Sequence, residues 1–451
     1  MKTLTYIHMI KYKLVVVVLF ILTSLGVNAQ EHVNLTLKEA VDLALENNWK
    51  VRQAGQMIGV STSDLKMANS IFLPSINLSE TYITTSDPLT AFGLKLRQEK
   101  TTTEDFNPVS LNDPGSVDNY TTQIRIEQPI INPDGMAARK MAMLGVKASK
   151  HNLAWSKKMV TIEVRKNYFN LQMAYEQKTE LMKSLDAGNA NLAVTIDLFE
   201  QGMVHKADLL GAELRKTEIK SQLIEAEARI NTFNSSLAHL IGTDQANLIV
   251  PLDILLNTDL PAQMLAVSNI PTERSDLQYW EMQAKASDFK LKSARNSWLP
   301  RLNAFGNYQW NDSRLAGTGA SNYLFGAMLE WDIFKGGRNL ASMQKANYQK
   351  ELAVINYEEK LSEGKMELTR VQNEIFIAWK QLELSDLAME QSEELFRVRT
   401  DRYAEGLEKT SDVITAEADV MNKRMSKLHN LNRYQQLIFN LEMLLEQEII
   451  K

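Results

Sequence analysis

Apolar residues recur every three or four positions along most of this chain, the period of an α-helix that buries one face. Between about 135 and 201 the strongest positions follow a seam of fours and threes, typical of coiled coils. They are Leu153, Val160, Val164, Leu171, Leu181, Leu185, Leu192 and Phe199. An unbroken helix here would be on the order of 100 Å long. Since the pattern resumes after the turn and runs to Gly242, we expect a helical hairpin over about 135–241.

The turn of that hairpin belongs to a fifteen-residue stretch that occurs twice, at 199–213 and 403–417. Each copy has an aromatic residue, a glycine, an aspartate and an Ala-Glu pair at the same internal spacing. Glycine ends a helix at low cost because it adopts the left-handed conformation without a Cβ penalty. An aspartate six residues later is a start signal for the next helix. We therefore expect two tight turns, each followed by a capped helix.

The apolar period changes from helical to two at four places, which predicts β-strands. The ranges are about 75–83, 120–128, 301–310 and 323–333. The strand at 75 follows a helical pattern that runs from Thr36 to about Phe72 and stops at Leu73-Pro74. Residues 84–119 are rich in Thr, Ser, Asp, Asn and Pro, which predicts a long exposed loop.

The second half of the chain repeats the element order of the first. Val164 and Phe199 reappear 204 residues later as Leu368 and Tyr403, while Leu73-Pro74 reappears as Leu299-Pro300, 226 residues later. The longer loop of the first half absorbs the difference. Such internal symmetry is typical of a duplication. The predicted repeats cover 30–242 and 276–451, the second with a helical hairpin over about 338–450, and a proline-punctuated connector covers 243–275.

The N-terminus has the pattern of a secretory signal peptide. Three lysines precede an apolar run from Leu14 to about Leu25, and Val27-Asn28-Ala29 offers a small-residue cleavage site before Gln30. The alternative is an N-terminal membrane anchor, for which the run is short. We expect export with removal of residues 1–29. No other stretch has the roughly 18 consecutive apolar residues of a membrane helix, so a span in the mature chain would consist of strands.

Composition excludes several classes of function. The net charge of −5 and pI of about 5.9 argue against nucleic-acid binding. Cysteine is absent, which excludes disulfides, Cys-based metal sites and lipid attached to an N-terminal Cys. The six histidines are too scattered for a metal cluster, and the carboxylates lack the partners of an acid–base site. We therefore expect no catalytic residue, no metal and no cofactor.

Four strands per chain cannot close on themselves, and open strand edges are forbidden in hydrocarbon. If the strands lie in a membrane, several chains must pool them. Aromatic residues near the strand ends fit the girdles of membrane interfaces. They are Tyr82, Tyr120, Tyr308, Trp310, Tyr323 and Trp331. The alternative is a pair of soluble hairpins on a helical rod, but the signal peptide and the duplication favour the membrane.

In this order, and twice over, these features resemble the TolC family of outer membrane efflux factors. The similarity covers almost the whole mature chain. It rests on the opening Leu35-Thr36-Leu-Lys-Glu-Ala40, the Leu-Pro strand entries, the Gly-x₅-Asp turns, and the strand exits Gln128-Pro129-Ile130-Ile131-Asn132 and Trp331-Asp332-Ile333-Phe334-Lys335-Gly336-Gly337. The resemblance implies a mainly α fold with membrane β: a homotrimer with a twelve-stranded outer-membrane barrel and a periplasmic tunnel of helical hairpins, the connector lying at its equator.

The resemblance also implies a function. The channel would be the passive exit duct of a tripartite efflux or type I secretion system, working with an inner-membrane pump and a periplasmic adaptor protein. Drug efflux, metal efflux and protein secretion use similar channels, because the pump selects the substrate. The alternative is a secreted helical scaffold that binds partners without conducting, which would need no lipid-facing strand surface.

The resemblance places both turns at the periplasmic tip. Gly202-Met203 and Gly406-Leu407 then become candidate adaptor contacts. Asp412 matches an aspartate that narrows the aperture, Thr415 stands where the family's archetype has a second acid, and Asp208 is the first-repeat equivalent of Asp412. Each aspartate equally suits a helix N-cap, worth about 1 kcal/mol.

Four basic residues that follow the turns are predicted to lie on solvated helix faces or in weak inter-helix ion pairs. They are Arg215, Lys216, Arg424 and Lys427. His205, beside the first turn, is a candidate pH sensor, although a surface histidine is the simpler interpretation.

Overall fold

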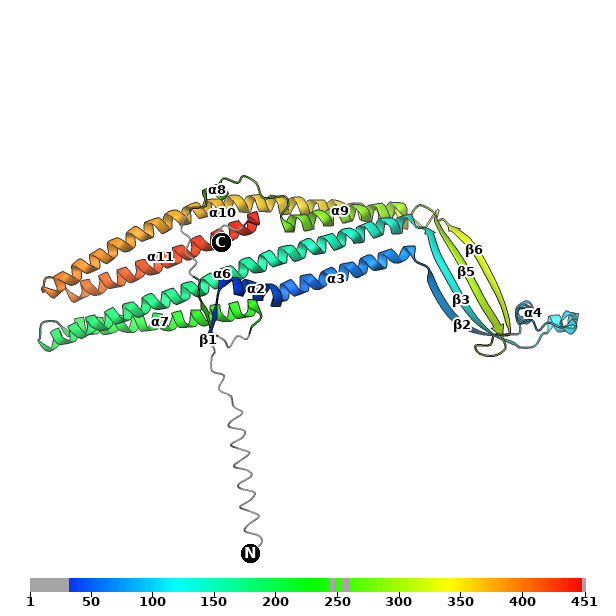
Figure 1. Cartoon of the computed structure of the whole chain (residues 1–451), viewed down its shortest axis with the longest axis horizontal. Helices are drawn as coiled ribbons and strands as arrows, with labels where there is room; N and C mark the ends of the chain where they lie inside the picture. The colour runs from blue at the N-terminus through cyan, green and yellow to red at the C-terminus, as the bar shows by residue number, and fades with distance from the viewer. Residues whose placement is uncertain (1–31, 244–247, 254–259, 448–451) are drawn as a thin grey trace, which may run out of the picture. The chain divides into compact units, whose positions relative to one another are not determined.

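The computed structural model describes residues 32–243, 248–253 and 260–447, so the predicted signal peptide lies outside the described residues. The chain forms two compact units. Unit 1 contains the chain up to Arg52, Ser156–Pro271 and the chain from Gly364; unit 2 contains Gln53–Trp155 and Thr272–Glu363. Two long helices, α6 (Pro133–Glu200) and α10 (Arg338–Ala404), contribute residues to both units (Figure 1). In the described part of the chain, no helix combines the length and the apolarity needed to cross a membrane.

Unit 1 contains the two helical hairpins. The later part of α6 turns into α7 (Lys206–Ile241), and the later part of α10 turns into α11 (Thr410–Leu445). The remaining elements are β1 (His32–Leu35), α2 (Leu37–Asn47), β4 (Leu248–Pro251) and the short α8 (Ala262–Leu265). Strands β1 and β4 pair in parallel, so the start of the described chain and the predicted connector form one small sheet.

The N-terminal helical pattern is divided in two. Thr36 starts α2 with a capping box, in which the Thr36 N–H donates to Glu39 Oε2 at 2.9 Å. The helix then breaks at Asn48, whose backbone is extended and whose Nδ2 donates to the Leu240 carbonyl at 2.9 Å. The expected single helix over 36–72 is therefore α2 followed by α3 (Trp49–Asn69) and a short 3₁₀ turn, η1 (Ser70–Phe72).

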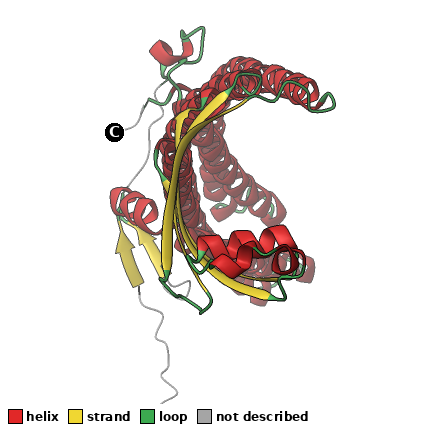
Figure 2. Cartoon of the chain, turned by 90° about the vertical axis from the view of Figure 1, so that its right-hand side faces the viewer, coloured by secondary structure: helices red, strands yellow, loops and turns green. Residues whose placement is uncertain are grey.

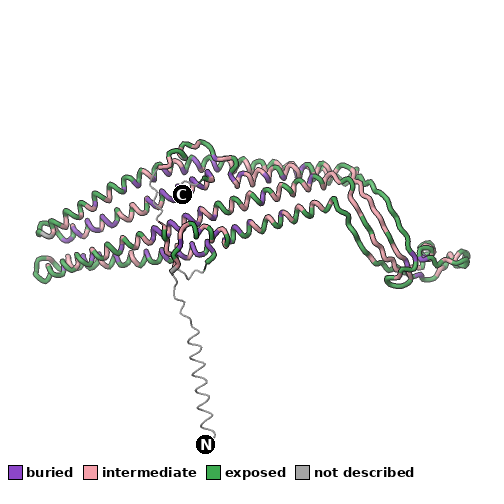
Figure 3. Tube along the Cα trace, in the orientation of Figure 1, coloured by how far each residue is buried: buried purple, intermediate pink, exposed green. Residues whose placement is uncertain are grey.

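The core of unit 1 lies where α6 and α11 pack together. Phe169 and Phe439, both fully buried, meet edge to face with ring centroids 6.3 Å apart. The predicted seam is fully buried from Val160 to Leu181 but opens toward the turn, where Phe199 is exposed. Burial of the seam therefore decreases toward the ends of the hairpins, as the buried residues in Figure 3 illustrate.

Unit 2 contains a four-stranded sheet. Its strands are β2 (Ser75–Thr85), β3 (Val117–Ile131), β5 (Arg301–Asp312) and β6 (Ala320–Glu330), with α9 (Ser275–Asn296) leading into β5. The order is β2-β3-β5-β6, and every neighbouring pair is antiparallel. Each half of the chain thus supplies one hairpin, and the two hairpins join through β3 and β5. The sheet is curved (Figure 2).

The expected long loop at 84–119 is instead folded, so that prediction was wrong. It contains α4 (Pro88–Arg97), a 3₁₀ turn η2 (Thr103–Phe106) and α5 (Pro108–Asn112). Asp87-Pro88 and Asn107-Pro108, two of the polar residue–proline pairs behind the loop prediction, are helix starts. Asp87 Oδ2 accepts from the Thr90 N–H at 2.8 Å, and proline occupies the first helical position, where its missing N–H costs nothing.

Candidate functional site

The strand register divides the sheet into two chemically different faces. Directly opposed residues of neighbouring antiparallel strands share a face. One row across all four strands consists of Leu78, Ile124, Tyr308 and Tyr323. The next row consists of Ile76, Ile126, Gly306 and Phe325. Leu78 is 69% exposed and Tyr323 is 71% exposed, so this apolar face has no cover in the described chain.

The opposite face is mainly polar. One of its rows consists of Ser79, Gln123, Gln309 and Asn322, and the next consists of Asn77, Arg125, Asn307 and the apolar Leu324. The four strands have 11, 15, 12 and 11 residues, at least the roughly 9–11 that a tilted membrane strand needs. Strands that alternate apolar and polar residues over this length have the chemistry of a sheet with lipid on one side and water on the other.

Five of the six predicted interface aromatics lie on the apolar face, toward the end of the sheet that carries the β2–β3 and β5–β6 connections. Tyr82 and Tyr120 are cross-strand partners with ring centroids 4.8 Å apart. The ring centroids of Tyr308 and Trp310 are 4.7 Å apart, and Tyr323 lies opposite Tyr308 on the neighbouring strand. Trp331 instead follows the last residue of β6, at the other end, where its Nε1 donates to the Trp298 carbonyl at 2.9 Å.

The two tips have the same backbone. Gly202 and Gly406 have φ values of 74° and 73°. The Met203 N–H donates to the Leu198 carbonyl at 2.8 Å, and the Leu407 N–H donates to the Arg402 carbonyl at 2.9 Å. This bond closes a Schellman motif, in which the residue after the glycine usually packs on the helix. Met203 and Leu407 are instead 69% and 61% exposed, so each tip presents an unpacked apolar side chain.

Asp208 and Asp412 are the third residues of their helices, so the prediction that they are N-caps was wrong. The N-cap positions belong to His205 and Lys409. Asp208 still supports its helix start, because its Oδ2 accepts from the His205 N–H at 3.0 Å. The Asp412 carboxylate instead lies 3.9 Å from Arg399 Nη1. Thr415 is exposed, and its Oγ1 donates back to the Ser411 carbonyl at 2.8 Å.

The side chains around the two tips differ in charge. At the second tip, Arg402 Nε donates to Glu408 Oε2 at 3.0 Å, and Arg399 lies 3.9 Å from both Glu408 and Asp412. The residues 204 positions earlier than Arg399, Arg402 and Glu408 are Thr195, Leu198 and Val204. The two tips thus share a backbone, but these three charged residues of the second tip have uncharged residues at the equivalent positions of the first tip.

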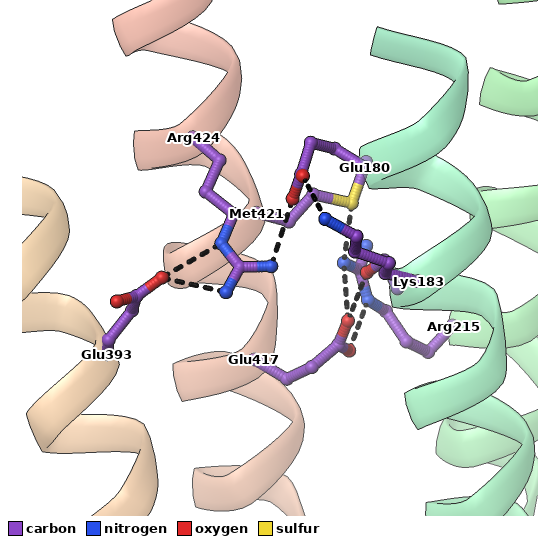
Figure 4. A network of polar contacts seen from close by, with 8 residues as sticks. Glu180, Lys183, Arg215, Glu393, Glu417, Met421 and Arg424 are labelled. Atoms are coloured by element: carbon purple, nitrogen blue, oxygen red, sulfur yellow. Dashed lines mark hydrogen bonds and ion pairs between the residues drawn. The ribbon is translucent and has the colours of Figure 1, made fainter. Parts of the chain in front are cut away.

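Arg215 was predicted to lie on a solvated helix face or in a weak inter-helix ion pair, but it is buried. Arg215 on α7 is 9% exposed and Glu417 on α11 is 5% exposed. Arg215 Nε donates to Glu417 Oε2 at 2.9 Å, and Ser184 Oγ on α6 donates to Glu417 Oε1 at 2.6 Å (Figure 4). Because α7 and α11 belong to different hairpins, this pair joins the two hairpins. Removal of one partner would leave the other charge buried without compensation.

Arg424 extends the same network toward α10. Its Nη2 donates to Glu393 Oε1 at 2.7 Å, and its Nη1 donates to Glu180 Oε2 of α6 at 3.1 Å (Figure 4). These contacts border a cavity of about 250 Å³. Lys427 pairs with Asp386 at 2.6 Å at a more exposed position, which agrees with the predicted weak inter-helix pairs. Nothing in the local sequence signals that Arg215 finds its partner 202 residues away.

The described residues offer little basis for metal chemistry. Within the described ranges, no three His, Cys, Asp or Glu side chains lie close enough together to hold a metal ion. The charged side chains of the second tip pair among themselves, as do those around Arg215 and Arg424.

The two-faced sheet and the paired hairpins are the fold of TolC-like outer membrane channels. The outer membrane efflux protein family matches residues 40–243 and 266–445, and the chain belongs to that family. The second matched segment begins inside the predicted connector.

Two relatives show the extent of the sequence similarity. The probable outer membrane lipoprotein SilC of Salmonella typhimurium is 26% identical over 216 residues, 45% of either chain. The cation efflux system protein CusC of Escherichia coli K12 is 25% identical over 215 residues, again 45% of either chain. The matched segment therefore spans just under half the length of these relatives.

The solved structures extend the similarity to the whole fold. The crystal structure of the Campylobacter jejuni CmeC outer membrane channel has a TM-score of 0.75 and 18% sequence identity, and the match covers 91% of this chain and 85% of that one. At this identity the likeness establishes the architecture, while function rests on the residues of this chain.

Proposed function

We propose that this protein is the outer membrane exit channel of a tripartite export system. The observation that carries the proposal is the two-faced sheet. An uncovered apolar face of strands long enough to span a bilayer is unfavourable in water and suited to lipid, and a polar opposite face is suited to a water-filled lumen.

The proposal requires three chains. β2 and β6 are the edges of the sheet within the described chain, and unpaired edges are costly in hydrocarbon. A homotrimer would pair them and produce a closed sheet of twelve strands. Its helical hairpins would extend into the periplasm, with a passive lumen along the axis. Transport through such a duct needs no catalytic residue, cofactor or nucleic acid.

The tips supply the contacts with the other components. The exposed Met203 and Leu407, held out by Gly202 and Gly406, suit docking of a periplasmic adaptor that links the channel to an inner-membrane pump. Asp412 and Thr415, just inside the second tip, would border the aperture, with Asp208 in the equivalent position of the first repeat. Three copies of Asp412 around an axis would favour cations and resist tight closure.

The experiment compares two neighbouring residues on opposite faces of β2. Leu78→Arg places a charge on the proposed lipid face, which costs about 2–4 kcal/mol near the middle of a bilayer. Ser79→Arg places the same charge on the proposed lumen face, where water solvates it. We expect heat-resistant trimers in the outer membrane fraction for Ser79→Arg, and strongly reduced amounts for Leu78→Arg.

Conduction is measured on the same material. The wild-type trimer should give discrete conductance steps in planar lipid bilayers. A mature protein that behaves as a water-soluble monomer without affinity for bilayers would refute the proposal and favour the secreted helical scaffold.

A further inference from the structure

The folded segment between β2 and β3, residues 86–116, covers part of the sheet, and we call it the strap. Its helix α4 buries Ala91 and Leu94 against Val117 at the start of β3. Residues three apart lie on one side of a helix, so α4 has a definite buried side. The strap is therefore seated on the sheet at the end that carries the strand connections.

The strap lies on the polar face. Val117 and Asn119 share a face of β3 with Gln123, because side chains alternate along a strand. Gln98, the residue after α4, is buried, and its Nε2 donates to Asn119 Oδ1 at 2.8 Å and to the Asp118 carbonyl at 2.7 Å. Asn119 Nδ2 in turn donates to Asn311 Oδ1 on β5 at 3.1 Å. Through these buried amides, the contact between the strap and the sheet extends from β3 to β5.

The strap also crosses the sheet. α4 contacts β6 as well as β3. Lys100 Nζ donates to Ser313 Oγ, in the connection between β5 and β6, at 2.7 Å. Figure 2, viewed from the end that carries the strap, shows its helical turns on the concave side of the curved sheet. The polar ends of β3, β5 and β6 thus all lie beneath or beside the strap.

Internal contacts keep the strap folded. Lys95 Nζ and Asp105 Oδ1 are 2.7 Å apart and join α4 to η2. Phe92 and Phe106 meet edge to face with ring centroids 5.4 Å apart. Asp87 and Asn107 cap its two helices. With these contacts the strap occupies a fixed volume, unlike a flexible loop.

We infer that the strap is a size filter: it narrows the outer end of the lumen so that small solutes leave and folded proteins do not. The inference rests on the proposed function, which makes the polar face the wall of the lumen. Three copies around one axis would project from three sides into the same opening. Among the cargoes that a channel of this type can carry, small drug-sized or ionic solutes then fit this protein.

The experiment measures which reagents reach the lumen past the strap. The natural sequence contains no cysteine, so Gln123→Cys introduces a single thiol on the polar face, two rows deeper than Asn119. In the strapless variant, residues 86–116 are replaced by Asn-Gly. Thr85 and Val117 are direct cross-strand partners, so a two-residue turn can close that hairpin. Intact cells are treated from outside with a small maleimide or with a large polyethylene glycol maleimide.

We expect the small reagent to label Gln123→Cys with and without the strap, and the large reagent to label it only without the strap. Leu89→Cys, on the exposed surface of α4, is the control thiol that both reagents should reach. Equal labelling of Gln123→Cys by the large reagent with and without the strap, whether high or low, would overturn the inference.

A second variant guards against misfolding of the strapless protein. Leu94→Ala with Gln98→Ala keeps the chain length and removes one apolar and one polar contact of the seat. It should admit the large reagent partially, and an unchanged exclusion would count against the strap as the filter. Bilayer conductance of the wild type is measured separately. Conduction without size filtering would refute only the inference that the strap is a filter, whereas absent conduction would refute the proposed function.

Discussion

At the scale of single residues, Asp208 and Asp412 show how one residue type at equivalent positions acquires different roles. Asp208 bonds the backbone of its own helix start, whereas the Asp412 carboxylate faces Arg399 and belongs to the ionic second tip. Removal of the Asp208 carboxylate should therefore cost stability, about 1 kcal/mol for a helix cap. Removal of the Asp412 carboxylate should change charge at the proposed aperture and cost little stability.

Asp412→Asn should weaken block of the channel by divalent cations, because three carboxylates around one axis attract them most strongly. The measurement is the half-blocking concentration in planar bilayers, which should rise. Asp208→Asn is the comparison variant: because the Asp208 carboxylate already accepts from the His205 N–H, this change should raise the half-blocking concentration less and lower thermal stability more. Unchanged block in Asp412→Asn would remove this residue from the aperture.

The strap should open in acid. Hydrogen bonds from Lys95 and Thr102 to the Asp105 carboxylate lower the pKa of this carboxyl group to about 2. A carboxyl group whose pKa is lower in the folded state stabilises the fold fully when the pH is above its pKa in the unfolded state, about 3.9. This stabilisation is lost as the pH falls toward the pKa of the folded state. Pepsin cleavage within 98–110 should therefore increase between pH 4 and pH 2. Asp105→Asn should be cleaved throughout this range, and wild-type cleavage independent of pH would contradict the prediction.

At the scale of elements, a polar network joins α6, α7, α10 and α11; it is buried at Arg215 and Glu417 and partly exposed at Arg424 and Glu393. The seam there is only partly buried, so apolar contact alone holds the hairpins less firmly than in the core around Phe169. Arg215 and Glu417 add a buried ion pair, and a second such pair, Arg165 with Glu442, joins α6 to α11 at 2.9 Å. The position and partners of these charges fix which helix faces meet.

Glu417→Ala should destabilise unit 1 by about 3 kcal/mol, because it leaves the Arg215 guanidinium buried without its partner. Glu394→Ala is the matched control. It removes an equally close pair with Arg397, but both side chains are mostly exposed, so the expected loss is below about 1 kcal/mol. Helix unfolding followed by circular dichroism compares the two melting temperatures. Equal shifts would show that burial of the pair contributes nothing.

Local signals in the sequence predicted the elements and the turns. Gly202 and Gly406 could be assigned because a left-handed helix end is a demand of the backbone that glycine meets best. The strands could be assigned because alternation reflects their two faces. The predicted helix starts lie three residues too late, because each aspartate was taken as the N-cap, whereas it is the third residue of its helix.

Contacts between distant parts of the chain could not be predicted in this way. Arg215 has the surroundings of a surface residue in the sequence, and only the fold brings Glu417 to it. The strap was missed because polar composition and Asp-Pro or Asn-Pro pairs are shared by loops and by helix starts. Its buried apolar residues Ala91 and Leu94 become a core only through Val117 of a neighbouring strand.

At the scale of the whole molecule, duplication explains why the two repeats have the same elements and differ mainly in their connections. Each repeat supplies one strand hairpin and one helical hairpin, and the sheet is continuous because β3 of the first repeat pairs with β5 of the second. Insertions distinguish the repeats where the elements end: the strap lies between β2 and β3, while a short turn joins β5 to β6.

The matching backbones of the two tips have an evolutionary consequence. Because the offset of 204 residues holds without a gap from the glycine through the following helix start, either tip sequence can replace the other by recombination without loss of register. Under the adaptor contacts proposed above, a lineage can therefore adapt one set of tips to a new adaptor while the other set preserves the old attachment, so that a change of partner need not pass through an unattached intermediate.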